Sequence, residues 1–347
     1  MARRQSEANG ARRSLWVLLF MVFVFCSVAY IGLSAAMRPR RGDSSSSVVD
    51  SGRGAKEGAK EEEEEEEVGK CCRGIEGLEL WGAAVKWGSD HRFDSARGCC
   101  RACEAMCPAA SSDRPCLCNS WVFCGDRARC GDRFGECWLK KQEDVLFPAV
   151  AAIGENVMWT SGLIFGEGEG IIGLETDYGT LHVKLLPACA PRSVSYISEL
   201  LQSRHSAGCQ IYRAEDRGNS WDLNGFHIAD ASFGPPYALL QGTLEGEGIP
   251  FKNIPTEACP TIKRGSVAWV GSGPEFFISL ANHYEWRKAY TVFGSVLPKS
   301  MEIAEKIASL PTKPDIWKSF NVSVLKKPIS IKIKRITKGT KSSFHES

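Results

Sequence analysis

The chain has 347 residues, 43 % of them hydrophobic, which is long enough for two domains with tails and apolar enough to build their cores. Its 43 Lys and Arg residues nearly balance 41 Asp and Glu residues. The resulting net charge of +2 argues against a nucleic-acid partner. An acidic run covers residues 61–67 and basic residues gather over 326–341, and such runs are typical of solvated linkers and surfaces.

A short N-terminal tail, residues 1–14, is followed by an uncharged apolar segment over residues 15–37. Its length suffices to cross a hydrocarbon core about 30 Å thick. A cleaved signal peptide is the alternative, but the apolar part of such a peptide is usually about 7–15 residues long. The arginines before the segment favour a cytoplasmic N-terminus. The sequence therefore predicts a signal anchor through residues 15–37, in the ER, Golgi or plasma membrane, with all later domains lumenal or extracellular.

Residues 38–70 contain consecutive serines, several glycines and the acidic run, without apolar periodicity. A segment of this composition cannot bury enough surface to offset its chain entropy. We therefore predict a disordered acidic stalk between the membrane and the next domain.

A dense group of cysteines comes next, with eleven of them within residues 71–137. Behind a membrane anchor this density indicates a region held together by disulfides. Zinc is the alternative, because Cys100 and Cys103 have a spacing that metal ligands use; however, no second pair follows at a suitable distance, and His91 is the only histidine nearby. Eleven is an odd number, so one cysteine must stay free or pair outside the region.

Three motifs mark the same region. They are CCRAC at 99–103, CNSWVFC at 118–124 and ECWLK at 136–140. With them, residues 71–163 resemble a PAN/apple-type module. The resemblance implies a small disulfide-rich α+β module whose helix is tied to a sheet, and a protein or carbohydrate ligand. A small spacer held by disulfides is the alternative.

A second domain is predicted over residues 166–336, beginning with a hairpin and a helix. Apolar residues alternate with polar ones over 172–176 and again over 181–185, with a turn between, which predicts a β-hairpin. Pro191 is suited to the first turn of a helix, and the residues that would form the apolar face of that helix are Val194, Ile197, Leu200 and Leu201.

The C-terminal half of this domain carries further strand and helix signals. Two apolar runs, at 276–278 and 291–296, are rich in strand-forming residues and flank an aromatic-containing loop. A helix follows in which Ile303, Ile307 and Leu310 share a face, and Pro311 ends it. Alternating isoleucines over 329–333 predict a last strand, and residues 337–347 form a basic tail.

These elements resemble a known domain. The FFI motif at 276–278, the TVFGSV motif at 291–296 and the strand, turn, strand, Ala-Pro, helix order are similar to the cyclophilin-type peptidyl-prolyl cis-trans isomerase domain. The resemblance covers about 171–336. It implies a mainly β architecture, a closed antiparallel β-barrel with two helices, and proline-containing proteins as substrates.

Isomerising an X-Pro bond requires few chemical groups. The barrier of about 18–20 kcal/mol exists because the nitrogen lone pair is delocalised into the carbonyl group. A guanidinium that donates to the prolyl nitrogen favours the twisted state, while an apolar pocket holds the ring. The family resemblance assigns Arg213 as this donor. It also implies a substrate-binding set, namely Leu239, Gln241, Phe277, Trp286 and Tyr290. No nucleophile, metal or cofactor is needed, and the sequence has no metal-binding or nucleotide-binding motif.

Two departures from the family leave the function open. The chain carries a long insertion at residues 216–238, and the loop before Phe276 is contracted. One hypothesis is therefore a membrane-anchored isomerase that assists protein folding in the secretory pathway, and the other is a catalytically degenerate adaptor that binds proteins or glycans. A glycan-modifying enzyme is disfavoured because no nucleotide-binding motif is present.

Asn321 begins an N-x-Ser sequon and is predicted to be glycosylated in a lumenal domain.

Overall fold

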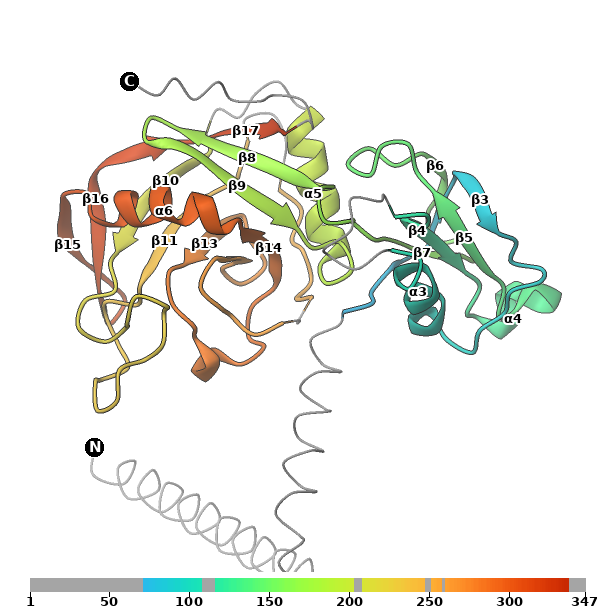
Figure 1. Cartoon of the computed structure of the whole chain (residues 1–347), viewed down its shortest axis with the longest axis horizontal. Helices are drawn as coiled ribbons and strands as arrows, with labels where there is room; N and C mark the ends of the chain where they lie inside the picture. Colours follow the sequence, from blue (N-terminus) through green and yellow to red (C-terminus); the bar gives the residue numbers. More distant parts are fainter. Residues whose placement is uncertain (1–70, 108–115, 203–207, 247–250, 258–259, 337–347) are drawn as a thin grey trace, which may run out of the picture. The chain divides into compact units, whose positions relative to one another are not determined.

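The computed structural model of the chain describes residues 71–107, 116–202, 208–246, 251–257 and 260–336 (Figure 1). The predicted N-terminal tail, membrane anchor, stalk and basic C-terminal tail lie outside these ranges. Among the residues described, no helix has both the length and the apolar character that a membrane crossing requires.

The cysteine-rich region folds into two small antiparallel sheets and short helices. Its elements are β1 (Ile75–Glu76), β2 (Leu78–Leu80), β3 (Ala83–Lys86), α3 (Ala96–Glu104), β4 (Ser120–Phe123), α4 (Arg127–Cys130), η1 (Gly131–Arg133), β5 (Cys137–Lys141), β6 (Val150–Ile153) and β7 (Thr160–Leu163). One sheet has the order β1-β7-β4-β5-β3, and β2 pairs with β6 in the other. Ser95 caps the N-terminus of α3: its hydroxyl accepts a hydrogen bond from the Gly98 N–H at 3.2 Å and so satisfies one donor of the first turn.

Disulfides hold α3 against this sheet, as predicted for the region. The pairs among the described residues are Cys71–Cys189, Cys72–Cys100, Cys99–Cys137, Cys103–Cys118, Cys107–Cys116 and Cys124–Cys130. Cys71 is the odd cysteine of the region, and its partner Cys189 lies outside it, in the second part of the chain. The prediction of a disulfide framework is confirmed. Within the described ranges, no three His, Cys, Asp or Glu side chains are grouped so that they could hold a metal ion.

The second part of the chain is a ten-stranded antiparallel sheet with two helices packed on it. Its elements are β8 (Ile171–Thr176), β9 (Gly179–Leu185), α5 (Pro191–Gln202), β10 (Gln210–Glu215), β11 (Leu239–Thr243), β12 (Ser266–Trp269), β13 (Glu275–Ser279), η2 (Tyr284–Trp286), β14 (Val292–Val296), η3 (Pro298–Ser300), α6 (Met301–Ala308), β15 (Thr312–Trp317), β16 (Phe320–Ser330) and β17 (Lys332–Arg335). The predicted hairpin is β8 with β9, and the predicted helices are α5 and α6, so these elements are confirmed.

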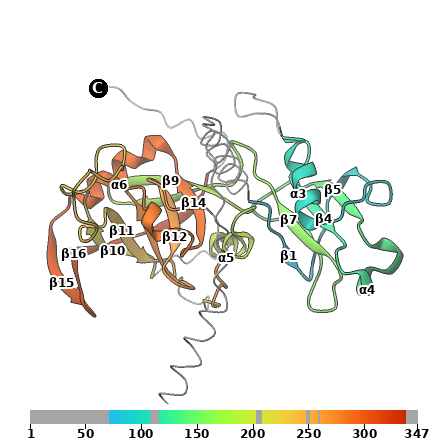
Figure 2. The ribbon, with the colours of Figure 1, turned by 90° about the horizontal axis from the view of Figure 1, so that it is seen from below.

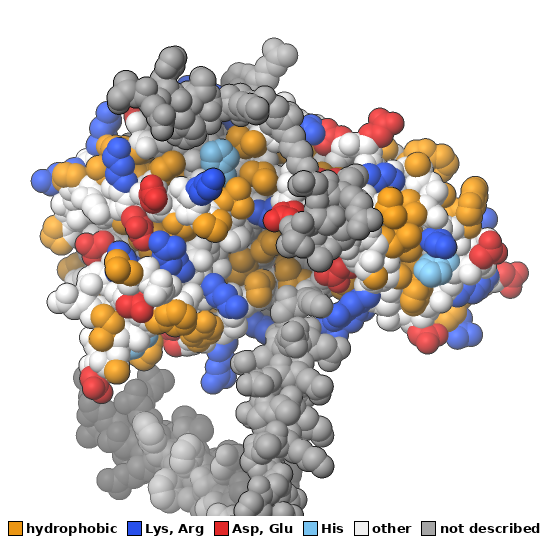
Figure 3. All heavy atoms as spheres, in the orientation of Figure 1, with side chains coloured by type: hydrophobic (Ala, Val, Ile, Leu, Met, Phe, Trp, Pro, Cys, Tyr) orange, Lys and Arg blue, Asp and Glu red, His pale blue; other side chains and the backbone are white. Residues whose placement is uncertain are grey.

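Helix α5 packs against β14 and β17, and α6 packs against β9, β10 and β11 (Figure 1, Figure 2). The apolar faces predicted from the sequence point into one core, in which Ile197 of α5 and Ile307 of α6 are both fully buried with Leu181 and Phe293 from the sheet. On the face shown in Figure 3, acidic and basic side chains are interspersed over the described residues.

The prediction of a closed barrel is wrong. The sheet has the order β15-β16-β10-β11-β13-β12-β14-β9-β8-β17, and its two terminal strands do not pair with each other. The predicted last strand is interrupted at Ile331: Ser330 of β16 still pairs with β10, whereas Lys332 of β17 already pairs with β8. Strand β15 pairs with β16 and is the edge strand at that end of the sheet. The chain therefore crosses at Ile331 from one end of the sheet to the other. No described strand at one end is hydrogen-bonded to a strand at the other end, so the barrel is not closed.

Candidate active site

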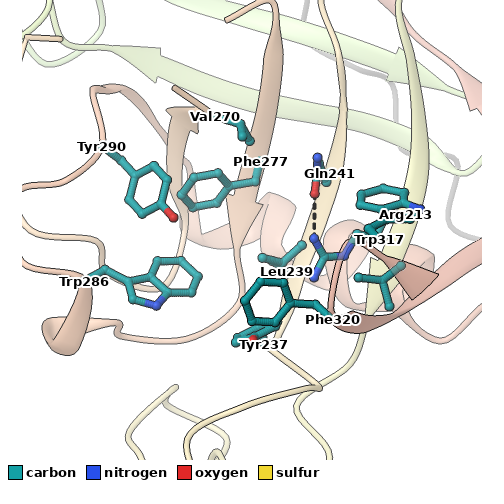
Figure 4. Close-up of a pocket in the computed structure, with 11 residues that line it drawn as sticks. Arg213, Tyr237, Leu239, Gln241, Val270, Phe277, Trp286, Tyr290, Trp317 and Phe320 are labelled. Atoms are coloured by element: carbon teal, nitrogen blue, oxygen red, sulfur yellow. Dashed lines mark hydrogen bonds between the residues drawn. The ribbon is translucent and has the colours of Figure 1, made fainter. Parts of the chain in front are cut away.

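All six residues that the family resemblance assigns to catalysis and substrate binding lie in one pocket of about 270 Å³ (Figure 4). The pocket is lined by Arg213, Tyr237, Leu239, Gln241, Val270, Phe277, Trp286, Tyr290, Trp317, Phe320 and Val322. The structure thus brings the assigned residues together, while their roles in catalysis and binding remain a prediction.

Three neighbouring strands place the centre of the site. Arg213 on β10 lies opposite Gln241 on β11, and Gln241 in turn lies opposite Phe277 on β13. Residues directly opposite each other on antiparallel strands project to the same face of the sheet, so these three side chains form a row. The register of β10 shifts between Ile211 and Arg213 against both of its neighbours. A bulge of this kind re-aims a side chain, here the arginine.

The Arg213 side chain is held by two neighbours and is 11 % exposed. Its Nη1 donates to Gln241 Oε1 at 2.8 Å, and its Nε donates to Glu215 Oε1 at 2.9 Å. Nη2 lies 2.9 Å from the same Glu215 oxygen. A guanidinium has five N–H groups and these contacts use three of them, so Nη1 and Nη2 each retain one N–H without a partner among the described residues.

Glu215 anchors this arrangement and was missed in the sequence. Its carboxylate is 2 % exposed and accepts hydrogen bonds from the backbone N–H of Tyr237 at 2.7 Å and of Ser323 at 3.3 Å. These contacts join β10 to the end of the insertion and to β16. The signal was present, because Arg213 and Glu215 are two residues apart on one strand and therefore share a face.

Gln241 is oriented by contacts at both ends of its amide group. The oxygen accepts from Arg213, and Nε2 donates to the Tyr212 hydroxyl at 3.2 Å. The side chain is 8 % exposed. Its position between Arg213 and the aromatic side of the pocket is therefore fixed by the protein itself.

Aromatic side chains form an apolar wall opposite Arg213 (Figure 4). Phe277 makes edge-to-face contacts with Trp286, at 5.7 Å between ring centroids, and with Tyr290 at 5.2 Å. Phe277 is only 2 % exposed and also packs against Ile262 and Val292 in a small buried cluster. Burial raises the pKa of Tyr290, although Arg213 acts in the opposite direction. Tyr290 is therefore a neutral wall residue at ordinary pH.

The insertion at 216–238 packs beside this wall and ends in the pocket. Trp221, 4 % exposed, makes an edge contact with His283 at 4.6 Å, and His283 lies parallel to Trp286 at 3.7 Å. His283 Nε2 donates to the Tyr237 carbonyl at 2.8 Å, and Nδ1 is 2.7 Å from Glu285 Oε1. Burial lowers the pKa of His283, and the nearby Glu285 opposes this shift. His283 thereby connects the insertion to the aromatic wall.

The β15–β16 hairpin supplies the remaining side of the pocket, which the sequence did not predict. The Trp317 ring lies 5.4 Å from Arg213 Cζ, and the Tyr237 ring lies 5.8 Å from it. Phe320 and Val322 continue this side along β16. The guanidinium therefore has aromatic rings near it in addition to its ion-pair partner.

A family model agrees with the resemblance seen in the second part of the sequence. Residues 171–332, just under half of the chain, match the model of the family described as cyclophilin type peptidyl-prolyl cis-trans isomerase/CLD. This part of the chain is therefore a cyclophilin-type domain, and the match supports isomerase activity. A search of curated proteins found no matching relative.

Three solved structures are similar to part of the chain. A cyclophilin type peptidyl-prolyl cis-trans isomerase of Cryptosporidium parvum, crystallised in the presence of the dipeptide Ala-Pro, is 16 % identical over 48 % of this chain and 99 % of its own, with a TM-score of 0.36. Another structure of that protein gives 17 % identity over 47 % and 97 %, with a TM-score of 0.33. A cyclophilin of Hirschia baltica gives 12 % over 45 % and 72 %, with a TM-score of 0.24.

Proposed function

We propose that this chain is a membrane-anchored peptidyl-prolyl cis-trans isomerase that assists protein folding in the secretory pathway. The observation that carries the proposal is Arg213: a buried guanidinium, fixed by Glu215 and Gln241, that keeps N–H groups without a partner among the described residues and faces an apolar wall containing Phe277.

The reaction follows from this geometry. The proline ring of a substrate packs against Phe277 and Leu239, and the Gln241 amide orients the neighbouring peptide group. As the X-Pro bond twists, the nitrogen lone pair leaves conjugation and becomes able to accept a hydrogen bond. An N–H of Arg213 donates to that lone pair and so stabilises the twisted state more than either planar state. The donor is already oriented, so little reorganisation is needed.

The test is an isomerisation assay on the full chain in its oxidised form, since Cys71 is bonded to Cys189. Catalysis of a Pro-containing peptide above its spontaneous rate is the expected result. Peptide binding without any catalysis would instead favour the adaptor.

Location in the secretory pathway rests on the uncharged segment at 15–37 and on the disulfides, which persist in oxidising compartments. Asn321 lies on β16 with its side chain exposed, where an oligosaccharide transferase could reach the unfolded or folded chain. We expect a glycosidase-sensitive mass shift that Asn321→Gln abolishes. Protease digestion of a C-terminal epitope in intact microsomes would contradict this topology.

A binding role for the PAN/apple-like region is the second candidate function. Two tryptophans, Trp81 at 64 % exposure and Trp87 at 62 %, present large apolar surfaces on this region. Lys140 Nζ lies 5.5 Å from the Trp81 ring, and Trp87 packs edge-on against Trp138 at 5.3 Å. Exposed aromatic side chains of this kind are enriched at protein interfaces. The proposed partner is a protein or a carbohydrate, and a Trp81→Ala/Trp87→Ala variant that still captured it equally well would exclude this surface.

A further inference from the structure

The pocket has a second group of aromatic residues that the family resemblance leaves unassigned. Trp317 and Phe320 lie on the Arg213 side of the pocket, whereas Phe277, Trp286 and Tyr290 lie on the other side (Figure 4). Tyr237 borders both sides, because its ring lies 5.8 Å from Arg213 Cζ and 6.2 Å from the centroid of the Trp286 ring. The unassigned residues come from the end of the insertion and from the tip of the β15–β16 hairpin, two segments far apart in the sequence.

The hairpin register explains how Trp317 and Phe320 come to share a face. They are directly paired across the turn at Lys318, which has a φ of 58°. Since paired residues of antiparallel strands project to the same side, both rings face the pocket. The next pair, Ile316 with Asn321, faces away from it, and neither residue lines the pocket.

Two of these residues, Trp317 and Tyr237, are tied to neighbours within the protein. The Trp317 Nε1 donates to Asp315 Oδ2 at 3.0 Å, and the backbone N–H of Tyr237 donates to Glu215 Oε2 at 2.7 Å. Both rings lie within the range of cation–π attraction from Arg213. Trp317 and Tyr237 are thus partly pre-organised, which lowers the cost in conformational entropy of binding an apolar group.

The chemistry of this wall favours a large apolar occupant. Phe320 is 55 % exposed although it borders the cavity, while Val322 beside it is 5 % exposed. Covering the Phe320 ring would remove apolar area from water. An acidic occupant would gain less electrostatic stabilisation, because the Arg213 charge is already compensated by Glu215, whose Oε1 lies 2.9 Å from Arg213 Nη2.

We propose that Tyr237, Trp317 and Phe320 form a second subsite that receives an aromatic or large aliphatic side chain next to the proline of the substrate. This inference rests on the proposed isomerase function. The proline ring occupies the Phe277 side and the peptide bond lies at Arg213, so the side chain that reaches the opposite wall belongs to the residue adjacent to the proline. Substrate preference is thus set by elements outside the row of Arg213, Gln241 and Phe277.

The experiment compares three blocked tetrapeptides, Ala-Ala-Pro-Ala, Ala-Phe-Pro-Ala and Ala-Ala-Pro-Phe, with the full chain in its oxidised form as the enzyme. NMR exchange spectroscopy gives kcat/KM for each peptide relative to its spontaneous rate. We expect one of the two Phe peptides to exceed the Ala peptide by about tenfold, the scale of burying one large apolar side chain in part. Phe320→Ala and Trp317→Ala should each reduce that ratio towards one.

Ile316→Ala is the matched control, because Ile316 is an apolar residue of the same hairpin, 69 % exposed, whose side chain does not line the pocket. It should keep the wild-type ratio. Equal kcat/KM for all three peptides would overturn the subsite while leaving the proposed function intact. If no peptide is isomerised, the proposed function fails, and titration with the same peptides then decides: a Phe preference that Phe320→Ala removes supports the subsite, and equal affinities overturn it.

Discussion

Glu215 holds Arg213 from the side opposite Gln241: its Oε1 accepts from the arginine Nε at 2.9 Å, while Gln241 Oε1 accepts from Nη1 at 2.8 Å. Both charged side chains are buried. The direction in which the remaining N–H groups point is therefore set by Glu215, which makes it a positioning residue and not a catalytic one.

Glu215→Gln should separate positioning from mere packing, because it keeps the shape of the side chain and removes its charge. Removing one partner of a buried ion pair costs about 3–5 kcal/mol, so we expect a comparable loss in the free energy of unfolding, measured with urea. Because Arg213 is held less firmly in this variant, we also expect its kcat to fall by a larger factor than its KM rises. Glu302→Gln, an exposed carboxylate in the first turn of α6, is the control and should change neither quantity. Wild-type values for Glu215→Gln would show that the pair does not orient Arg213.

Arg213→Ala should lower kcat by roughly 10²–10³-fold with a much smaller change in KM, because the proposed hydrogen bond forms chiefly in the twisted state. Arg213→Lys should not restore the rate, since an ammonium lacks the fixed donors of a guanidinium. Arg192→Ala removes an exposed arginine at the start of α5 and should behave as wild type. Catalysis that persists undiminished in Arg213→Ala would refute the assigned site.

The family resemblance assigned the central residues of the site because it rests on short local motifs. Arg213, Gln241 and Phe277 were each assigned from a few neighbouring residues, and antiparallel pairing of β10, β11 and β13 places them in a row. The helices α5 and α6 were predicted for the same reason, since each has an apolar face within its own segment. The disulfide framework could be predicted from the density of cysteines. The partner of its odd cysteine, Cys71, could not be predicted in this way.

Several parts of the fold and of the site were not predicted, because local sequence gives little signal for them. Strand β12 (Ser266–Trp269) was missed because it is short and joined to β13 by a tight connection, so the pattern around 265–296 gave only two strands. Strand β15 contains Pro314 and is mostly exposed, so no alternation marks it. The positions of Tyr237 and Trp317 follow from the path of the insertion and from the hairpin register, and neither can be read from local sequence.

Phe277→Ala should weaken peptide binding and stability together. The ring is 2 % exposed and forms part of a buried cluster, so its removal should cost about 3–5 kcal/mol in the free energy of unfolding. KM should rise because the proline ring loses its main contact. Phe277→Leu, which fills most of the volume, should recover much of the stability but not the low KM. A normal KM in Phe277→Leu and Phe277→Ala alike would place the proline elsewhere.

Reduction should unfold residues 71–137 and leave the ten-stranded sheet folded. The core around α3 consists largely of cystines, packed with Trp121 and Phe123, whereas the core of the sheet contains Cys209 only as a free thiol. The Cys99–Cys137 bridge alone closes a loop of 38 residues, which corresponds to roughly 4 kcal/mol in the chain-entropy model. Limited proteolysis with and without reductant measures this, and unfolding by a chelator in place of the reductant would instead indicate a metal site.

Acidification should destabilise the wild-type protein through His283. This side chain is fully buried between Trp221 and Trp286, and burial lowers its pKa below the usual 6.5. Above pH 6.5 the imidazole is neutral in both the folded and the unfolded chain, so it adds no pH dependence. Below pH 6.5 the unfolded chain binds a proton that the folded chain does not, and stability falls by up to about 1.4 kcal/mol for each unit of the pKa depression.

The free energy of unfolding should therefore drop more steeply between pH 7 and pH 5 in the wild type than in His283→Phe, which retains the ring stacked on Trp286 but cannot titrate. Equal slopes for the two proteins would mean that His283 takes up its proton in the folded state, with Glu285 outweighing burial.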